Sequence, residues 1–395
     1  MKYRKITDLN IAGKILFIRT DMNVPIIDGK ISDYTRIDSG IKTINYALEN
    51  GAKIVLATHL GRPEELIFGQ SIKDEDSVKI ICDALSYRIN KKIKLISTVP
   101  AQFDFEDYDI VMLENVRCNL GEKINNPELG KKYANLCDIF VHDAFASGHR
   151  KEASTDSVGD FCDDVCAGIQ MTEEIESINQ ALDNPQKPVV AIVGGSKVST
   201  KLNILKNLTL KVDYLIVGGG ILNTFLLSLN KKVGKSLVEK NLVEASQEIM
   251  DTMNKKGKKV PLPATVITSK HFNNDDPAIE KNLTDLDSDD MILDIGVSFS
   301  DEIDKIISTA KTIIWNGPVG VFEFDKFANG TKRLGESIAK SGAYSLAGGG
   351  DTISAINKFN LAKNISYIST AGGALLEYLE GKELPVFSLL RRKYK

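Results

Sequence analysis

The chain has 395 residues, enough for two or three domains at about 150 residues each. Hydrophobic residues make up 43% of the chain and charged residues 26%, which is typical of an ordinary soluble globular protein. The net charge of −3 disfavours nucleic acid as the main partner, and no apolar run approaches the ~18 residues of a membrane span.

The cysteines and the first residues bear on the cellular compartment. The five cysteines are odd in number and show no Cys-x-x-Cys, and the spacing of Cys162 and Cys166 predicts neighbours on one helix face more than a metal site. The basic opening of the chain has no apolar core behind it, unlike a signal peptide. We therefore expect a reduced, cytoplasmic protein that does not bind membranes.

Apolar runs alternate with helical patterns along almost the whole chain. The expected strands are residues 15–18, 54–57, 110–113 and 139–141 in the first half, and 189–193, 214–217, 291–295, 312–315, 343–347 and 367–368 in the second. This rhythm predicts an α/β fold of doubly wound parallel sheets with helices on both faces. Ten strands are too many for one compact core, so we expect two such domains.

The cut between the two domains is expected at residues 171–188. Residues 171–182 have the pattern of one helix, and Pro185 and Pro188 prevent it from continuing into the next strand. We therefore expect an N-terminal domain over 1–170, an interdomain helix and linker over 171–188, and a C-terminal domain over 189–384.

In the second half, strand after strand ends in glycine. The turns that follow the strands are 194–197, 218–220, 316–323, 348–352 and 370–374. Ligands of open α/β sheets bind at the carboxyl ends of strands, so these turns predict a groove lined by backbone N–H groups that suits an anion. None of the turns matches a P-loop or a dinucleotide-binding fingerprint.

The turn at 348–350 is followed directly by Asp351 and Thr352 at the expected start of a helix. An acid beside an anion site repels the anion unless a cation lies between them, and Mg²⁺ on a nucleotide phosphate is the usual one. The alternative is that Asp351 is an ordinary helix N-cap and that the glycines merely turn the chain.

Lys197 and Lys201 lie in or near a first helical turn, where the helix dipole disfavours a cation. A bound polyphosphate would supply the missing negative charge, whereas the alternative is a pair of solvated lysines. Glu323 is suited either to accept hydrogen bonds from ribose hydroxyls or to cap its own turn.

The expected loops of the first half carry guanidinium groups instead of glycines. The polar residues of these loops are Arg19, Asp21, Asn23, Arg36, His59, Arg62, Arg117, His149 and Arg150. Guanidinium forks bind carboxylate and phosphate groups through two parallel hydrogen bonds, so this set predicts a small substrate that carries both groups. Taken singly, each arginine is better explained by a surface ion pair, and His59 and His149 are more often structural hydrogen-bonding residues than catalytic ones.

Six ordered blocks of this chain match one family. They are Arg19–Pro25, His59–Pro63, Glu114–Arg117, Gly194–Val198, Trp315–Glu323 and Gly348–Thr352. The chain resembles the phosphoglycerate kinases from end to end. The resemblance implies two Rossmann-like lobes, with the C-terminal tail at 385–395 packing back on the first, and a monomer that transfers the acyl phosphate of 1,3-bisphosphoglycerate reversibly to MgADP.

The resemblance also implies two sets of binding residues. Those for the phosphoglycerate are Asp21, Asn23, Arg36, His59, Arg62, Arg117 and Arg150. Those for the nucleotide are Lys197, Lys201, Gly218, Gly219, Gly220, Asn316, Glu323, Gly348, Gly349, Gly350, Asp351 and Thr352, with Asp351 as the contact to Mg²⁺.

The expected chemistry is positional and electrostatic. In the direction that consumes ATP the nucleophile is a carboxylate, which is already ionised at neutral pH and needs no general base. In-line placement and positive charge on the transferred group are what remain to be supplied. We expect Arg36 and Lys197 to supply this charge, together with the N–H groups of Gly349 and Gly350, in lobes that close around a hinge at 171–188.

Three residues depart from the usual family pattern: Ala146, Glu152 and Ala371. Ala371 would be strained if its position required a positive φ, and Glu152 adds a negative charge near the expected anion site. Two other functions share parts of this pattern. A nicotinamide dehydrogenase would need the G-x-G-x-x-G fingerprint, and a two-lobed anion-binding protein would normally be exported.

Overall fold

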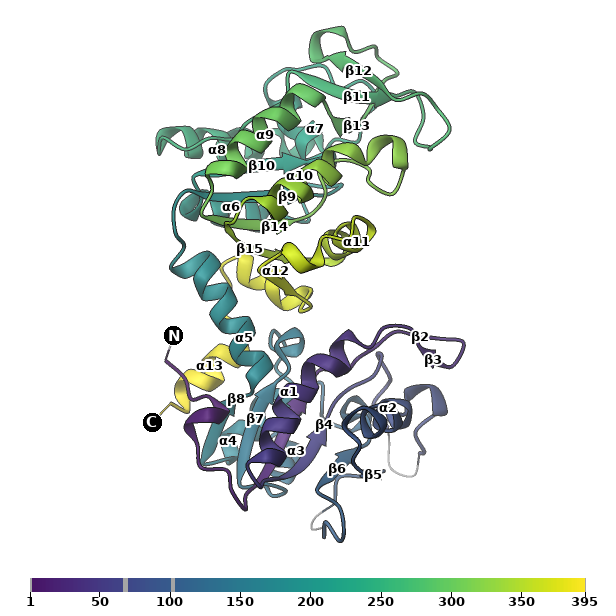
Figure 1. Ribbon diagram of the computed structural model, residues 1–395, viewed down its shortest axis with the longest axis vertical. Helices are drawn as coiled ribbons and strands as arrows, with labels where there is room; N and C mark the ends of the chain where they lie inside the picture. Colours follow the sequence, from purple (N-terminus) through teal and green to yellow (C-terminus); the bar gives the residue numbers. More distant parts are fainter. Residues whose placement is uncertain (1, 67–69, 101–103, 395) are drawn as a thin grey trace. The chain divides into compact units, whose positions relative to one another are not determined.

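The computed structural model describes residues 2–66, 70–100 and 104–394, and these form two compact units. One unit consists of Met1–Ile175 with Glu383–Lys395, and the other of Glu176–Lys382. Each unit is built on a parallel sheet with helices around it (Figure 1), which confirms the predicted α/β fold class. No helix in the described ranges has both the length and the apolar character needed to cross a bilayer.

The first unit has a six-stranded parallel sheet in the order β5-β6-β4-β1-β7-β8. Its strands are β1 (Ile15–Thr20), β4 (Lys53–Ala57), β5 (Ile93–Ile96), β6 (Ile110–Leu113), β7 (Ile139–Asp143) and β8 (Asp164–Ala167). A short hairpin of β2 (Ile26–Ile27) and β3 (Lys30–Ile31) stands apart from this sheet. The four predicted strands of this half are confirmed, whereas β5 and β8 were not predicted.

Successive side chains of each strand point to opposite faces of this sheet, which explains why helices cover both faces. Leu16 and Ile18 of β1 share a core with Ile37 of α1 (Thr35–Glu49) and with α2 (Lys79–Ile89). Phe17, between them, points to the other face, where its ring centroid lies 5.3 Å from that of Tyr133 in α3 (Pro127–Ala134). Successive side chains of a strand face opposite ways, so a strand that is apolar at every position needs a layer on each side.

The prediction for Cys162 and Cys166 is wrong. Cys162 directly follows the short helix α4 (Val158–Phe161), and Cys166 lies in strand β8. The spacing suits a helix, but parallel pairing with β7 determines the local structure here. The Cys162 sulfur lies 3.9 Å from that of Cys137, and all five cysteines are free thiols.

The far C-terminus belongs to the first unit. Helix α13 (Pro385–Arg392) buries its apolar side, and the backbone N–H of Val386 donates to the carbonyl of Gly148 in the loop after β7. Phe387 stacks on Phe145 of the same loop at 5.9 Å between ring centroids, and Arg392 pairs with Asp156 and Asp160. These contacts tie the chain's last helix to the loop that carries His149, Arg150 and Glu152.

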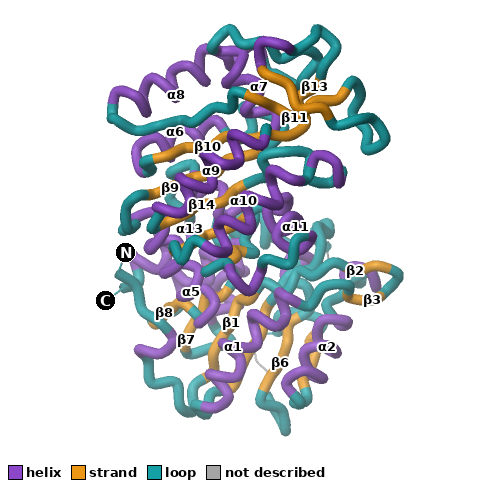
Figure 2. The backbone as a smooth tube through the Cα atoms, turned by 45° about the horizontal axis from the view of Figure 1, so that its top comes forward, coloured by secondary structure: helices purple, strands orange, loops and turns teal. Residues whose placement is uncertain are grey.

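The second unit has a five-stranded parallel sheet in the order β10-β9-β14-β15-β16. Its strands are β9 (Val189–Gly194), β10 (Tyr214–Gly218), β14 (Thr312–Asn316), β15 (Tyr344–Gly348) and β16 (Tyr367–Ser369). Its helices are α6 (Leu202–Lys211), α7 (Gly219–Ser228), α8 (Val243–Lys255), α9 (Val297–Thr309), α10 (Asn329–Lys340), α11 (Gly350–Lys358) and α12 (Gly373–Leu379). Figure 2 distinguishes the helices, in purple, from the strands, in orange.

A separate antiparallel sheet in this unit corrects one expectation. Strand β13 (Met291–Ile295) exists as predicted, but it pairs antiparallel with β11 (Thr265–Ser269), which also pairs with β12 (Ile279–Asn282). An apolar run of five residues carries no information about the direction of its neighbour, so the parallel assignment of 291–295 was wrong. The expected helix at 171–182 is α5 (Ile169–Ile178) followed by a wider turn over Asn179–Asp183.

The direction in which the chain crosses the sheet reverses once in each unit. In the first, the chain leaves β1 toward β4 and leaves β7 toward β8, in opposite directions along the sheet. In the second, the same reversal separates β9, which leads to β10, from β14, which leads to β15. Ligands of open α/β sheets bind at the carboxyl ends of the strands at such a reversal.

Candidate active site

The first unit gathers polar side chains at the carboxyl ends of its strands. The loops after β1, β4, β6 and β7, with the start of α1, carry the predicted residues Asp21, Asn23, Arg36, His59, Arg62, Arg117 and Arg150. Because parallel strands end at the same edge of a sheet, loops that are far apart in sequence meet there.

Asp21 is the centre of the first cluster. It is 5% exposed, and Nη1 of Arg36 lies 3.1 and 3.0 Å from its two carboxylate oxygens. Asp21 also accepts the N–H of Asn23 at 3.1 Å, and the Asn23 amide oxygen accepts the N–H of Gly61 at 2.9 Å. The Asp21 carboxylate thus connects the loop after β1 to the first turn of α1, and the Asn23 side chain connects the same loop to the loop after β4.

His59 is a neutral member of this cluster. Its Nδ1 lies 4.0 Å from Asp21 and 3.3 Å from Nη2 of Arg19, which is fully buried. Burial, reinforced by nearby arginines, lowers the pKa of His59 well below its usual value despite the attraction of Asp21. Burial works against ionisation of Asp21 as well, but its cationic neighbours and the Asn23 N–H outweigh it and lower the pKa of Asp21.

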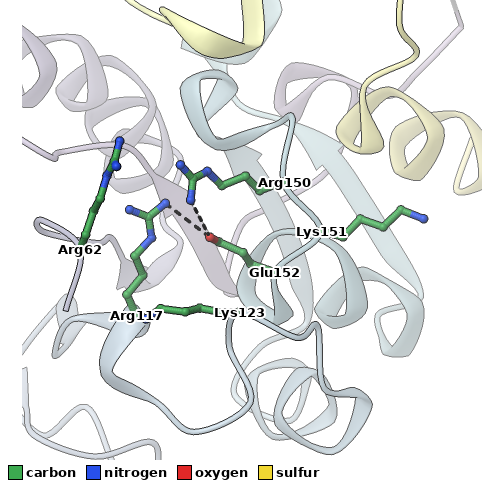
Figure 3. Close-up of a pocket in the computed structure, with 6 residues that line it drawn as sticks. All are labelled: Arg62, Arg117, Lys123, Arg150, Lys151 and Glu152. Carbon is green, nitrogen blue, oxygen red and sulfur yellow. Dashed lines mark hydrogen bonds and ion pairs between the residues drawn. The ribbon is translucent and has the colours of Figure 1, made fainter. Parts of the chain in front are cut away.

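A second cluster forms a basic pocket of about 450 Å³, which we define by Arg62, Arg117, Lys123, Arg150, Lys151 and Glu152. Arg117 is 5% exposed and donates to the carbonyl of Gly61 at 3.0 Å. Arg117 and Arg150 direct their guanidinium groups toward the Glu152 carboxylate, whereas Lys151 points away (Figure 3). The basic pocket therefore has five positive side chains and one negative.

In the second unit, Lys201 lies at the reversal of strand order. Its ammonium group donates to the carbonyl of Gly194 at the end of β9 at 2.7 Å, and to that of Asn316 at the end of β14 at 3.0 Å. Burial lowers the pKa of Lys201 to about 8, although Asp351 acts in the opposite direction. The structure thus assigns Lys201 a role in holding two strand ends together. Lys197, four residues earlier, is exposed.

Asn316 and Thr352 join two of the glycine turns. The Asn316 amide donates to the carbonyl of Gly348 at 2.8 Å. The Thr352 hydroxyl donates to the same carbonyl at 2.9 Å and accepts the N–H of Gly317 at 2.8 Å. Both side chains are almost fully buried, and their hydrogen bonds hold the turns after β14 and β15 together.

Close backbone approach explains the glycines at these turns. A Cβ on Gly194 would lie 1.7 Å from the carbonyl oxygen of Pro318, and one on Gly220 would lie 2.1 Å from that of Ser196. Gly219 and Gly349 also have positive φ angles, of 63° and 98°, which residues with a Cβ atom rarely adopt. The turns after β9, β10 and β14 are therefore packed backbone to backbone.

Asp351 does not cap its helix. The N-cap of α11 is Gly349 and shows no side-chain hydrogen bond, while Asp351 is exposed in the first turn. The N-cap alternative for Asp351 is therefore wrong. Asp351 and the exposed Glu323 instead line a pocket of about 600 Å³, together with Gly195, Gly219 and Gly220.

The apolar part of this 600 Å³ pocket was not predicted from the sequence. It is lined by the apolar residues Leu237, Phe272, Met291 and Phe324 and by the buried Asn223. Phe272 is 59% exposed, and its ring centroid lies 5.1 Å from that of Phe324. These residues come from five separate segments that share no local motif, so the sequence has no signal that groups them.

Two of the three departures from the family pattern are conformationally neutral. Ala146 and Ala371 are not among the described residues with positive φ, and the left-handed conformation near Ala371 falls on Gly372 at 46°. The condition for strain at Ala371 is therefore not met. The third departure, Glu152, lines the basic pocket, so its negative charge lies among the positive side chains of that pocket.

Comparisons with known proteins agree with this geometry. The family model described as phosphoglycerate kinase matches residues 6–382. The solved phosphoglycerate kinase of Coxiella burnetii is 44% identical, with a TM-score of 0.95 and 100% of each chain covered. That of Pyrococcus horikoshii OT3 is 29% identical, with a TM-score of 0.80 and 99% of each chain covered. The chain belongs to the phosphoglycerate kinase family.

Proposed function

We propose that the two units divide the family's reaction between them, with the phosphoglycerate on the first and the magnesium nucleotide on the second. The reaction is reversible transfer of a phosphoryl group between 1,3-bisphosphoglycerate and MgADP, which yields 3-phosphoglycerate and MgATP. The single observation that carries this division is the contrast between the two crevices. One is lined by guanidinium groups, and the other by glycine turns and apolar side chains.

The first unit has the chemistry for a small acid with a phosphate group. Arg62, Arg117 and Arg150 of the basic pocket suit a phosphate group, because guanidinium forks match its oxygens two at a time. Asp21, Asn23, Arg36 and His59 are connected by short contacts and suit the hydroxyl and carboxyl end of the ligand. In this role the neutral His59 can donate or accept one hydrogen bond without adding charge.

The second unit has the chemistry for a nucleotide. In the 600 Å³ pocket, the apolar part around Leu237, Phe272 and Phe324 suits a purine ring, and Glu323 suits ribose hydroxyls. The turns at Gly195, at 218–220 and at 348–350 suit the phosphate chain through their backbone N–H groups.

Mg²⁺ fits this site only as a companion of the nucleotide. Asp351 is exposed at the pocket and offers hard carboxylate oxygens, which magnesium prefers. Within the described residues the one group of three clustered acids is Asp287, Asp289 and Asp290, and these acids are paired with Lys270 and Lys281. One carboxylate alone leaves the other coordination positions to phosphate oxygens and water. When bound, the ion would neutralise charge on those phosphates.

The catalytic contribution of the protein is placement and charge. The attacking carboxylate of 3-phosphoglycerate is ionised at neutral pH, so no side chain has to remove a proton. We assign Arg36, Lys197 and the N–H groups of Gly349 and Gly350 to the charge that develops on the transferred group. Because in-line transfer requires the two ligands to meet, the segment 171–188 serves in this proposal as a hinge for the two units.

The test is a coupled assay with 3-phosphoglycerate and MgATP. We expect activity in the unmodified chain and a fall in turnover of about 10²–10³-fold for both Arg36→Ala and Lys197→Ala. Arg36→Lys, which keeps the charge but not the fork, should retain part of the activity. Lys206→Ala removes an exposed lysine from α6 and serves as the control. Near-normal turnover of either alanine variant would contradict the role of that residue.

The proposal also includes a cytoplasmic, monomeric enzyme. Monomeric state is tested by light scattering coupled to size-exclusion chromatography at working concentrations, where a dimer mass would contradict it. Controls with NADH and with 3-phosphoglycerate alone distinguish the kinase from the dehydrogenase and from the simple anion-binding protein.

A further inference from the structure

Glu152 is an acid inside a pocket that is otherwise basic. Its side chain is buried, and Oε1 lies 3.4 Å from Nη2 of Arg117 and 3.6 Å from Nη1 of Arg150 (Figure 3). A single carboxylate oxygen thus faces two guanidinium groups that the proposed function assigns to the substrate.

The second oxygen of Glu152 makes the arrangement unusual. Oε2 is buried and has no hydrogen-bond partner within the described ranges. A carboxylate with a purely structural purpose normally has both oxygens satisfied, because an unpaired buried oxygen costs free energy. Glu152 therefore holds the two arginines without being fully satisfied itself.

The backbone around Glu152 is positioned by other groups. The N–H of Ala153 donates to the carbonyl of Glu122, and Ser154 donates to the Glu122 carboxylate through both its N–H and its hydroxyl. The N–H of Glu152 itself donates to the Thr155 hydroxyl at 3.1 Å. None of these bonds uses the Glu152 side chain, so its charge can be changed without removing the contacts that place this segment.

We propose that Glu152 is a built-in counter-anion of the basic pocket, a positioning residue that holds Arg117 and Arg150 in the free protein and competes with the anionic group of the ligand for them. The inference rests on the proposed function of this pocket. The carboxylate keeps two like charges close together before the ligand arrives. Its negative charge remains when the ligand's phosphate group takes over the guanidinium hydrogen bonds, so Glu152 lowers the affinity and favours release.

The sign of this effect separates it from a structural role. A counter-anion weakens anion binding, so its removal should tighten binding. A residue that only orients Arg117 would have the opposite effect, because its removal would leave the guanidinium group misplaced. Glutamine has nearly the same shape as glutamate and keeps an oxygen that can accept from Arg117, so Glu152→Gln removes mainly the charge.

The experiment measures dissociation constants by titration calorimetry on the full chain, with 3-phosphoglycerate and inorganic sulfate as separate probes. For Glu152→Gln we expect both constants to fall by about tenfold, and the KM for 3-phosphoglycerate to fall with them. Glu152→Asp keeps the charge and should stay within about threefold of the unmodified protein. Glu49→Gln removes an exposed carboxylate at the end of α1 and should change neither constant.

Unchanged or weaker binding by Glu152→Gln would overturn the inference. Glu152→Ser removes the same charge with a smaller side chain, and it decides the sign if the glutamine variant does not fold. Arg62→Ala separates this inference from the function on which it rests. If Arg62→Ala leaves 3-phosphoglycerate binding intact, the pocket assignment itself fails. If Arg62→Ala weakens that binding while Glu152→Gln does not alter it, only the counter-anion role fails.

Discussion

Thr352 offers the sharpest test of how the glycine turns of the second unit are held. The resemblance to the family assigns this residue to nucleotide binding, but its hydroxyl is occupied within the protein. It donates to the carbonyl of Gly348 and accepts the N–H of Gly317, and the side chain is 1% exposed. Thr352→Val keeps the branched shape and removes both hydrogen bonds.

The magnitude follows from what each partner loses. The Gly348 carbonyl keeps a second donor in the Asn316 amide, so its lost bond costs little. The N–H of Gly317 loses its acceptor in a buried position, and a buried unsatisfied donor costs about 1–3 kcal/mol. We therefore expect Thr352→Val to lower the free energy of unfolding of the second unit by about 2 kcal/mol. That is about a 30-fold change in its folding equilibrium.

The assay is urea unfolding followed by tryptophan fluorescence. Trp315 is the one tryptophan in the sequence, is 1% exposed, and lies in the second unit two residues before Gly317. At a slope of about 2 kcal/mol per molar urea, the midpoint should fall by about 1 M. The control is Thr309→Val, which removes an exposed hydroxyl at the end of α9 and should cost under about 0.5 kcal/mol.

Two results would refute this reasoning. One is a midpoint for Thr352→Val that matches the Thr309→Val control, which would mean that the hydroxyl is not needed by the turns. The other is unchanged stability with a large loss of nucleotide affinity, which would make Thr352 a direct ligand. Loss of stability together with a modest rise in the nucleotide KM is the expected pattern.

Three further predictions concern the second unit. Burial raises the pKa of Asp294 to about 7, against a usual value of 3.8. Between these two pH values the folded state binds more protons than the unfolded state. The free energy of unfolding therefore falls as the pH rises from about 4 to 7. The stability deficit of Asp294→Asn, measured by Trp315 fluorescence, should therefore shrink between pH 5 and pH 8, and a constant deficit would contradict the shift. Gly220→Ala places a Cβ 2.1 Å from the Ser196 carbonyl and should cost about 1–3 kcal/mol while raising the nucleotide KM; a neutral result would show that the two turns can separate freely. Phe272→Ala removes a largely exposed ring, so we expect little change in melting temperature but about a tenfold higher KM for ATP, and an unchanged KM would remove Phe272 from the proposed purine site.

Much of the fold was accessible from local pattern alone. Every strand predicted from an apolar run exists, because a strand buried on both faces must be apolar at every position, and that signal is local. The strands that were not predicted are β2, β3, β5, β8, β11 and β12, and their apolar runs are shorter, less buried or interrupted by polar residues. β5 is only partly buried, β12 is mostly exposed, and β11 has Thr or Ser at three of its five positions. β8 is mostly buried but is a four-residue strand at the edge of its sheet. The direction of β13 was also out of reach, since it depends on its partner β11 and not on its own residues.

The sequence by itself determined the fold class, the guanidinium groups of one crevice, the glycine turns of the other and the family, because these are local features of the chain. It did not reveal the apolar lining of the second crevice, which comes from several distant segments. Only the tertiary structure decided what individual side chains do. Lys201 and Thr352 are predicted nucleotide contacts, and the structure shows that both also donate hydrogen bonds to carbonyl groups of their own unit. Glu152 meets Arg117 and Arg150 because loops from different strands converge at one sheet edge, and hydrogen bonds between such loops depend on distances that sequence spacing does not contain.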